Sequence, residues 1–456
     1  MYLYNINHSV KFVICGIRGM TNLEDMRINL KIVFLRVMER FPKRLHRIVL
    51  KTIIEARYIL FKMKWMIGSH NGIVDPARVY WISTNRISRC LLPEHRKKYF
   101  DSERMRGKVV GGDWDITNCE FTTTFDAYEA FRKRAKEGVE WRDTEYYKRI
   151  LRTAKSGIFL HGIKNETDLN RRCRYLDSLY ESIKTEGYHL NRDNSQNNIA
   201  FGEIDVNIGR NGEYIFRDGV HRLAIAKVLE IKYVPVMVFV RHRKWQEFRE
   251  FVVSHAQQNR DSGGKLYQPI VHPDLKDMPY DTSTHDYYEL MKAIEHNLGK
   301  KRGTMLDIGA NLGFFSHKFE DLGYQCYAVE RDPATFRIME KIKIAEGKKF
   351  ETINKSIFEA DFVRNTEFDV VLALNIFHHF LKTKTLYAQF LDLLKNLKTN
   401  ELFFEPHIPQ EPQMKGAYVN FAENEFVDFL MRHTSLNNSE IIYHDKNGRN
   451  VFKLSK

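Results

Sequence analysis

The sequence predicts an α/β fold for the C-terminal part of the chain, built on a doubly wound parallel sheet. A short apolar run from Thr304 to Ile308 breaks into a glycine turn and continues as a helical pattern from Phe314. A second strand pattern ends at Glu330, and a third, buried strand pattern spans residues 368–375. Strands that alternate with helical patterns in this way indicate βαβ units and a parallel sheet.

The glycine turn between the first strand and its helix is a candidate ligand-binding loop. It runs from Gly309 through Ala310 and Asn311 to Gly313, and Asp307 precedes it in the strand. Glycine has no Cβ to obstruct a ligand, and the following helix N-terminus offers unpaired N–H donors. A tight structural turn would explain the same glycines, so the loop alone leaves both interpretations open.

The second and third strands bring further polar groups to the same edge of the sheet. Glu330 follows the loop by about twenty residues, where an acid at a strand end can accept both ribose hydroxyls of an adenosine ligand. Asp332 and Pro333 predict a helix N-cap followed by proline in the first turn. The third strand leads into His378 and His379.

Residues 281–456 resemble a class I S-adenosylmethionine-dependent methyltransferase domain. The run from Asp307 to Gly313 is similar to the first motif of that family, Glu330 to its ribose-binding acid, and residues 369–379 to its fourth motif. A nicotinamide-binding Rossmann domain is the nearest alternative. That domain would need G-x-G-x-x-G, whereas Asn311 stands at the second glycine here and Gly313 follows only two residues later.

The resemblance implies a Rossmann-like sheet that binds S-adenosylmethionine. It places Asp307 near the methionine amino group, Glu330 on the ribose and Arg331 beside the adenine. The family's adenine-binding acid is missing, so Asn354 or Ser356 would have to replace it. Asn375 is either an orienting group or a strand-end turn residue. The implied cofactor-binding residues are Asp307, Gly309, Ala310, Asn311, Gly313, Glu330, Arg331, Ser356 and Asn375.

His378 and His379 are the candidate catalytic residues, because they follow the strand where the methyl acceptor should arrive. A histidine there could remove a proton from a hydroxyl, since its pKa lies near working pH. In the structural alternative, one histidine caps the next helix and stacks on Phe377 or Phe380.

The acceptor class is narrowed by the residues that follow the strand at 368–375 and a further strand at 401–404. The further strand leads into Glu405 and His407, a second polar pair at the same edge. The Asn/Asp-Pro-Pro-Tyr turn typical of amide-nitrogen methylation is missing after Asn375. This pattern resembles enzymes that act on small molecules, lipids, sugars or modified tRNA wobble bases.

A second informative stretch spans residues 201–245, within a domain expected at residues 160–258. Strand patterns at 203–208 and 214–216 flank an Asn-Gly turn dipeptide and predict a hairpin. A helix then starts at Asp218-Gly-Val-His-Arg222, and a further strand spans 234–240. Glycine at a helix start, with arginine in the first turn, can hold a phosphate through free amides, the helix dipole and the guanidinium.

This stretch resembles the ParB/sulfiredoxin-like fold, a smaller α+β domain. The resemblance implies phosphate or nucleotide binding at Asp218, Gly219, His221 and Arg222. A missing cysteine at the loop disfavours sulfiredoxin chemistry, and a missing helix-turn-helix disfavours DNA partitioning. The structural alternative is that Asp218 caps the helix and Arg222 pairs with it.

The expected domain organisation has five parts: a basic helical N-terminal segment (1–70), a mixed α/β region of unknown role (71–159), the ParB/sulfiredoxin-like domain (160–258), a linker rich in glycine and proline (259–284) and the methyltransferase domain (285–456). The amphipathic, basic pattern at 43–67 predicts a helix that lies on an anionic membrane surface or packs on the protein's own core.

Composition restricts the partners and the compartment. The formal net charge of +14 favours an anionic partner, whether a phosphate-bearing substrate, a lipid surface or a nucleic acid. The five cysteines are scattered and odd in number, which argues against a zinc site or disulfide framework and for a reducing cytosol. We therefore expect no metal and a cytoplasmic protein, peripheral to the inner membrane face if the basic segment binds lipid.

These observations favour methylation of an oxygen on a small molecule or on a glycan- or lipid-linked precursor, with the second domain binding phosphate or a nucleotide. A bifunctional kinase–methyltransferase is the alternative, with Glu203 and His221 as acid–base groups. A basic nucleic-acid-binding protein ranks last, because no recognition motif accompanies the basic N-terminal segment. The sequence does not determine the oligomeric state.

Overall fold

The computed structural model describes residues 74–456, apart from 76–77, 92–94, 96–97, 100–104, 118, 191–202, 261, 284–285 and 447. The predicted basic segment 1–70 lies outside these residues. Both sheets lie in one compact unit, Gly72–Tyr180 with Ile204–Lys456.

The C-terminal sheet confirms the predicted α/β architecture. Its seven strands are β7 (Thr304–Ile308), β8 (Gln325–Val329), β9 (Glu351–Ile353), β10 (Glu367–Leu374), β11 (Lys398–Glu405), β12 (Asn438–His444) and β13 (Asn450–Ser455). They lie in the order β12-β13-β11-β10-β7-β8-β9. The strands from β11 to β9 in this order are parallel, and β13 runs antiparallel to both of its neighbours.

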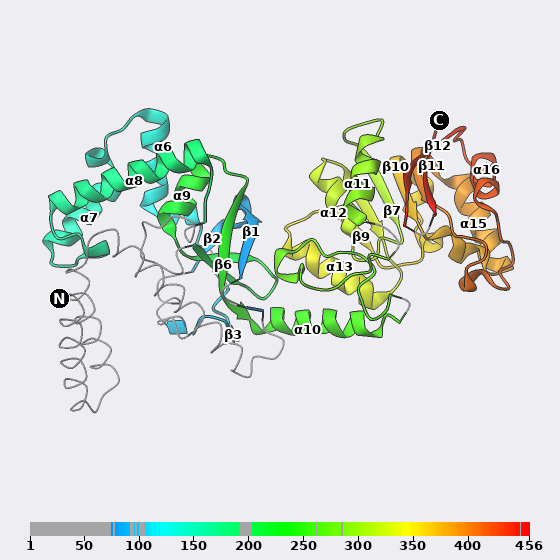
Figure 1. Ribbon diagram of the computed structural model, residues 1–456, viewed down its shortest axis with the longest axis horizontal. Coiled ribbons are helices and arrows are strands. Elements are labelled where there is room, and N and C mark those ends of the chain that lie inside the picture. Colours follow the sequence, from blue (N-terminus) through cyan, green and yellow to red (C-terminus); the bar gives the residue numbers. More distant parts are fainter. Residues whose placement is uncertain are drawn as a thin grey trace, which may run out of the picture. The chain divides into compact units, whose positions relative to one another are not determined.

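Helices cover both faces of this sheet (Figure 1). The helices are α11 (Tyr287–His296), α12 (Phe314–Asp321), α13 (Pro333–Ala345), α14 (Phe362–Asn365), α15 (Lys384–Asn396) and α16 (Glu423–His433). Successive strand residues join different cores: Met305 and Val370 pack with α11, α12 and α13, whereas Leu306 and Val371 pack with α15 and α16. This alternation follows from the two-residue period of a strand.

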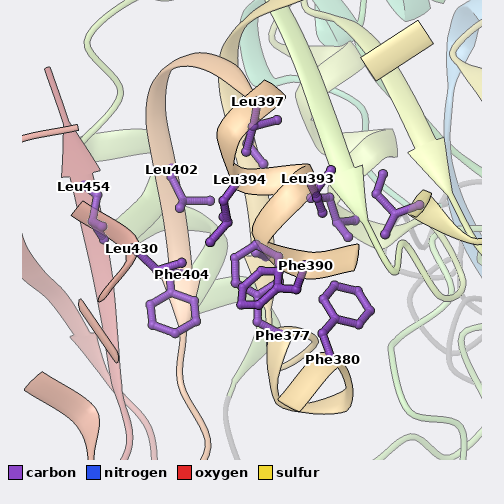
Figure 2. Close-up of a cluster of buried hydrophobic side chains, with 14 of the residues drawn as sticks. Phe377, Phe380, Phe390, Leu393, Leu394, Leu397, Leu402, Phe404, Leu430 and Leu454 are labelled. Atoms are coloured by element: carbon purple, nitrogen blue, oxygen red, sulfur yellow. The ribbon is translucent and has the colours of Figure 1, made fainter. Parts of the chain in front are cut away.

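Aromatic and leucine side chains dominate the core on the α15 side. Figure 2 shows Phe390 and Leu394 of α15 on the side of the helix that faces Leu402 and Phe404 of β11. Burying one such side chain stabilises the fold by roughly 1.5–3 kcal/mol. The cluster therefore fixes the position of β11 and of the chain that leaves its carboxyl end.

The strand order creates a switch point between β7 and β10. From β7 the chain continues outward to β8 and β9, and it then returns to β10 on the other side of β7. In open α/β sheets, ligands bind outside the carboxyl ends of the strands at such a point. Residues 309–313 and 375–379 follow those two strand ends.

The N-terminal sheet is mixed. Its strands are β1 (Val79–Ser83), β2 (Arg89–Cys90), β3 (Lys108–Val110), β4 (Ile204–Ile208), β5 (Tyr214–Asp218) and β6 (Tyr233–His242), in the order β1-β6-β4-β5-β2, with β3 also paired to β6. The accompanying helices are α5 (Phe121–Thr124), α6 (Asp126–Glu137), α7 (Glu145–Lys155), α8 (Glu166–Glu186), α9 (Val220–Val228) and α10 (Arg243–Gln258). The predicted hairpin is the antiparallel β4–β5 pair.

The segment expected to be a linker, residues 259–284, is held by a buried ion-pair network. Asp274 lies 2.7 Å from Arg241 and 3.5 Å from Arg249, and it accepts a hydrogen bond of 2.9 Å from Trp245 Nε1. Although burial opposes ionisation, the two guanidinium groups hold the pKa of Asp274 below its usual value. These contacts hold the middle of the segment against β6 and α10. The five domain boundaries remain predictions.

Three further observations concern the described part of the chain. No helix there is long and apolar enough to cross a membrane. The four cysteines within it carry free thiols: Cys90, Cys119, Cys173 and Cys326. No group of three or more potential metal ligands occurs among these residues.

Candidate functional site

The glycine loop after β7 depends on both of its glycines. Gly309 and Gly313 have φ of 74° and 76°, a region that residues with a Cβ rarely adopt. A Cβ would also come within 2.9 Å of Ile376 at Gly309 and within 2.9 Å of Met339 at Gly313. Asn311 adopts the same left-handed region, with φ of 52°. Glycine at positions 309 and 313 therefore avoids both the backbone strain and the contacts that a Cβ would make with Ile376 and Met339.

Glu330 joins the end of β8 to this loop. Its carboxylate accepts hydrogen bonds from the Asn311 amide (3.0 Å) and the Asp332 amide (2.7 Å). Burial raises the pKa of Glu330, and these hydrogen bonds oppose the rise. A carboxylate has about four acceptor positions, so both oxygens can still accept ribose hydroxyls. Asp332 accepts from the Thr335 amide at 2.7 Å, which confirms the predicted N-cap.

Asp307 is almost fully buried beside the loop, with 4% of its surface exposed. It accepts a hydrogen bond of 2.8 Å from the Ser316 hydroxyl. Burial raises its pKa to about 7, despite that hydrogen bond, and the Glu330 carboxylate adds to the rise. A bound ammonium group would favour the ionised form of such a carboxyl.

Asn375 lies at the end of β10 and contacts a residue that sequence reasoning missed. Its φ is 52°, and its Nδ2 donates to the Tyr267 hydroxyl at 2.9 Å. Burial raises the pKa of Tyr267 to about 12. The next residue, Gln268, accepts from the Phe314 amide at the start of α12 at 3.3 Å. Both residues lie in the segment expected to be a linker. Its glycines and prolines suggest an irregular connection, whereas the apolar Leu266 and Ile270 are a local sign that the segment is packed.

Two amide oxygens at this edge have no hydrogen-bond partner among the described residues. The Oδ1 atoms of Asn311 and Asn375 are buried, and no hydrogen bond reaches either from the described residues. Buried polar atoms are nearly always hydrogen-bonded, so each exception calls for an explanation. A ligand with hydrogen-bond donors at this edge would satisfy both.

The expected adenine-binding residues are engaged in local structure. Asn354 Nδ2 donates to the carbonyl oxygens of Glu330 (2.9 Å) and Arg331 (3.2 Å). Ser356 caps the short helix at Ile357–Glu359 and accepts from the Phe358 amide at 3.4 Å. Arg331 is exposed. Asn354 thus fixes the turn that follows β8, and the structure leaves the adenine contacts a prediction.

The two histidines after β10 differ in environment. His378 is 3% exposed, and burial lowers its pKa to about 2. Its Nε2 lies 3.0 Å from Gln413 Oε1. His379 is exposed, and its Nδ1 lies 3.3 Å from Lys382 Nζ. Neither caps the helix at Phe377–Leu381, and their rings contact each other at a centroid distance of 4.0 Å.

The second polar pair lies beside the first. Leu374 of β10 pairs with Glu405 of β11, so both strands end at one level. Glu405 is 1% exposed, and burial raises its pKa to about 7 although Arg449 lies 3.4 Å away. His407 Nε2 lies 2.8 Å from Asn420 Oδ1, and the His407 and His378 rings are 6.1 Å apart.

The predicted phosphate-binding loop, residues 218–222, lies at the start of α9. Gly219, with φ of 92°, is the N-cap of α9, and no side chain caps the helix there. Asp218 instead accepts from the Gly219 amide at 2.8 Å. His221 is buried, its Nε2 lies 2.9 Å from the Tyr146 hydroxyl, and burial lowers its pKa to about 3. The expectation that Asp218 caps the helix is therefore wrong.

Comparison with known proteins identifies the C-terminal part. Residues 306–397 match a family model described as a methyltransferase domain. The match runs from β7 to the end of α15 and includes the glycine loop, Glu330 and both histidines after β10. The chain therefore contains a methyltransferase domain of the class I, S-adenosylmethionine-dependent type. The ParB/sulfiredoxin-like character of residues 160–258 stays a prediction.

Several solved structures are similar to parts of the chain. Monomeric WbdD is 18% identical over 42% of this chain and 46% of that chain, with a TM-score of 0.34. The PH0226 protein of Pyrococcus horikoshii is 17% identical over 37% and 90%, with a TM-score of 0.30. A TehB-like SAM-dependent methyltransferase of Corynebacterium glutamicum is 13% identical over 38% and 89%, with a TM-score of 0.29. The match spans less than half of the WbdD chain. No curated protein matches this chain.

Proposed function

We propose that this protein transfers a methyl group from S-adenosylmethionine to an oxygen of a small molecule or of a glycan- or lipid-linked precursor. The observation that carries the proposal is the meeting of three groups at the switch point of the C-terminal sheet. The glycine loop, the Glu330 carboxylate and the buried Asp307 lie together, joined by the hydrogen bond from the Asn311 amide to Glu330.

The residues present fit this cofactor. Glu330 retains acceptor positions for ribose hydroxyls, and the buried Asp307 would gain from pairing with the methionine ammonium. The unpartnered Oδ1 atoms of Asn311 and Asn375 would accept from the cofactor's donors. When bound, S-adenosylmethionine supplies a methyl group already activated on a sulfonium.

The chain's own contribution is mainly alignment and proton handling. Methyl transfer is an in-line displacement, so positioning of the acceptor supplies much of the catalysis. His378 and His379 follow β10 at the acceptor edge and are the proposed catalytic residues. His378 is neutral at pH 7, because its pKa of about 2 lies far below that value. A neutral imidazole can accept a hydrogen bond from the acceptor hydroxyl.

Calorimetric titration of the full chain with S-adenosylhomocysteine tests the proposal. We expect binding at one site, with affinity at least about tenfold weaker in Glu330→Gln, equivalent to about 1.4 kcal/mol. Asp392→Asn is the matched control, because Asp392 is an exposed carboxylate on α15 paired with Arg364. A folded wild-type protein without binding, or an equal loss in the control, would contradict the proposal.

A second activity is proposed at the start of α9. The helix begins at Val220 after a left-handed Gly219, no side chain caps it, and Arg222 lies in its first turn. We infer that Asp218, Gly219, His221 and Arg222 bind a phosphate group or a nucleotide. A kinase activity would use His221 as an acid–base group. The hydrogen bond between His221 and Tyr146, together with the low pKa of His221, favours phosphate or nucleotide binding over proton transfer.

Titration with ATP separates this activity from methyl transfer. We expect Arg222→Ala to abolish ATP binding and to leave S-adenosylhomocysteine binding intact. Arg171→Ala is the control, because Arg171 is an exposed residue of α8 with only a surface ion pair to Asp168. Absence of ATP binding by the wild type would leave α9 with a structural role.

A further inference from the structure

The hydrogen-bond partners of Gln413 fix the way its side-chain amide faces. Gln413 Nε2 donates to Glu411 Oε2 at 2.6 Å, and Gln413 Oε1 lies toward His378 Nε2 at 3.0 Å. Burial opposes ionisation of Glu411, but hydrogen bonds from Gln413 and the Ile408 amide, with Arg449 nearby, lower its pKa. An ionised carboxylate only accepts hydrogen bonds. The NH2 group of Gln413 must therefore face Glu411, and its carbonyl oxygen must face His378.

The same arrangement recurs at His407. Asn420 Nδ2 donates to the Pro409 carbonyl at 3.0 Å, and Asn420 Oδ1 lies 2.8 Å from His407 Nε2. A peptide carbonyl also only accepts, so the carbonyl oxygen of Asn420 must face the histidine. In both histidines, Nε2 consequently carries the proton and Nδ1 carries a lone pair.

These two lone pairs are buried, and neither accepts a hydrogen bond from the described residues. The Nδ1 atoms of His378 and His407 have no hydrogen-bond partner among the described residues, and the side chains are 3% and 2% exposed. Buried polar atoms are nearly always hydrogen-bonded, so a buried acceptor without a partner calls for an explanation. Two such atoms on rings 6.1 Å apart, at the carboxyl ends of adjacent strands, point to a ligand that donates hydrogen bonds. His379 is exposed and contacts Lys382, so it is not part of this pair.

We propose that His378 and His407 recognise the methyl acceptor through its hydroxyl protons, with Gln413 and Asn420 as positioning residues that fix both tautomers. The inference rests on the proposed methyl transfer and narrows its substrate to an alcohol or polyol. A carboxylate, a phosphate dianion or an ether would place lone pairs against the two Nδ1 lone pairs. Acceptors of those classes are thereby excluded.

The proposed methyl-transfer step forms one bond, breaks one bond and releases one proton. The acceptor oxygen forms a bond to the methyl carbon while the carbon–sulfur bond breaks, and that electron pair stays on the sulfur of the sulfonium donor. The hydroxyl proton passes to Nδ1 of His378 and from the imidazolium to water. A methylated oxonium is a much stronger acid than an imidazolium, so a weakly basic histidine suffices as the proton acceptor.

Nitrogen-15 NMR of the full chain labelled at histidine tests the tautomers without any substrate. The resonances would be assigned with His378→Gln and His407→Gln. We expect both residues to carry the proton on Nε2. Gln413→Leu should give His378 a mixture of tautomers, and Asn420→Leu should do the same for His407. Gln389→Leu, an exposed glutamine on α15, should change neither. A proton on Nδ1 of either histidine in the wild type would overturn the proposal.

Glycerol and its trimethyl ether test the recognition of hydroxyls. With S-adenosylhomocysteine present, glycerol should shift the Nδ1 resonances of both histidines, because a donated hydrogen bond perturbs a lone pair. The ether, which donates none, should leave them unchanged. Equal shifts with both compounds, or none with glycerol, would overturn the inference. Failure of S-adenosylhomocysteine to bind would instead refute the proposed methyl transfer, and the tautomer measurement would still stand.

Discussion

At the residue scale, Asp307 makes cofactor binding depend on pH. Burial raises its pKa to about 7 from an ordinary 3.8, so the free protein holds a proton that a bound ammonium would displace. The affinity for S-adenosylhomocysteine should therefore increase as pH rises from 6 to 7 and level off above it, by up to about tenfold per pH unit. Titrations of wild type and Asp307→Asn across this range check the prediction. A pH-independent affinity in the wild type would contradict it.

The same carboxyl affects stability, with the opposite dependence on pH. Between about pH 4 and 7 the folded protein binds a proton that the unfolded chain has released, so stability falls as pH rises through this window. At pH 8 the cost of an ionised, buried Asp307 reaches a few kcal/mol. Asp307→Asn should thus be more stable than wild type at pH 8 and equal to it near pH 4. Urea unfolding at both values measures the difference, and equal stability at pH 8 would refute it.

Alanine substitution at Gly309 tests whether the loop requires the absence of a Cβ as well as a left-handed backbone. Alanine at Gly309 or at Gly347 should cost about 1–2 kcal/mol of backbone strain, because φ is positive at both. A Cβ at Gly309 also meets Ile376, whereas nothing lies within 4 Å of one at Gly347. Gly309→Ala should therefore lose cofactor affinity by tenfold or more, and Gly347→Ala should keep it. Equal affinities in a calorimetric titration would refute this role of the loop.

At the element scale, the buried Asp274 holds residues 262–275 against β6 and α10. Asp274→Ala would leave the guanidinium groups of Arg241 and Arg249 buried without this carboxylate, which typically costs about 3–5 kcal/mol. The partly exposed Asp277, which also pairs with Arg249, is the matched control and should cost less than about 1 kcal/mol. Denaturant unfolding compares the two variants. Similar losses in both would show that the network contributes little.

The sequence predicted four strands of the C-terminal sheet, β7, β8, β10 and β11, for a physical reason. Each of these contains a short apolar run near turn residues, and Asp332 with Pro333 marks a helix start by local chemistry alone. The pattern of β12, Asn438–His444, is largely polar and exposed, and it was not predicted. The contacts of Tyr267, Gln268 and Asp274 could not be predicted in this way. They join residues distant in sequence, and the surrounding glycines and prolines resemble a flexible linker. The amide orientations at His378 and His407 likewise depend on a loop, residues 409–420, that has no periodic pattern.

At the scale of the whole molecule, the net charge of +14 predicts salt-sensitive binding to anionic surfaces. The full chain should sediment with vesicles that contain phosphatidylserine at low salt, and much less at physiological ionic strength, because exposed charges are screened within about 8–10 Å. Vesicles of phosphatidylcholine alone are the control. Binding that is equal on both kinds of vesicle would contradict an electrostatic membrane partner.

The central claim is that the adenosyl cofactor binds at the carboxyl edge of the C-terminal sheet. Hydrogen exchange of the full chain, with and without S-adenosylhomocysteine, locates the site without any mutation. We predict slower exchange in peptides that cover residues 307–316, 330–332, 266–268 and 375–379, and no change in those that cover 218–222. Protection confined to residues 218–222, or none at all under saturating ligand, would contradict the account.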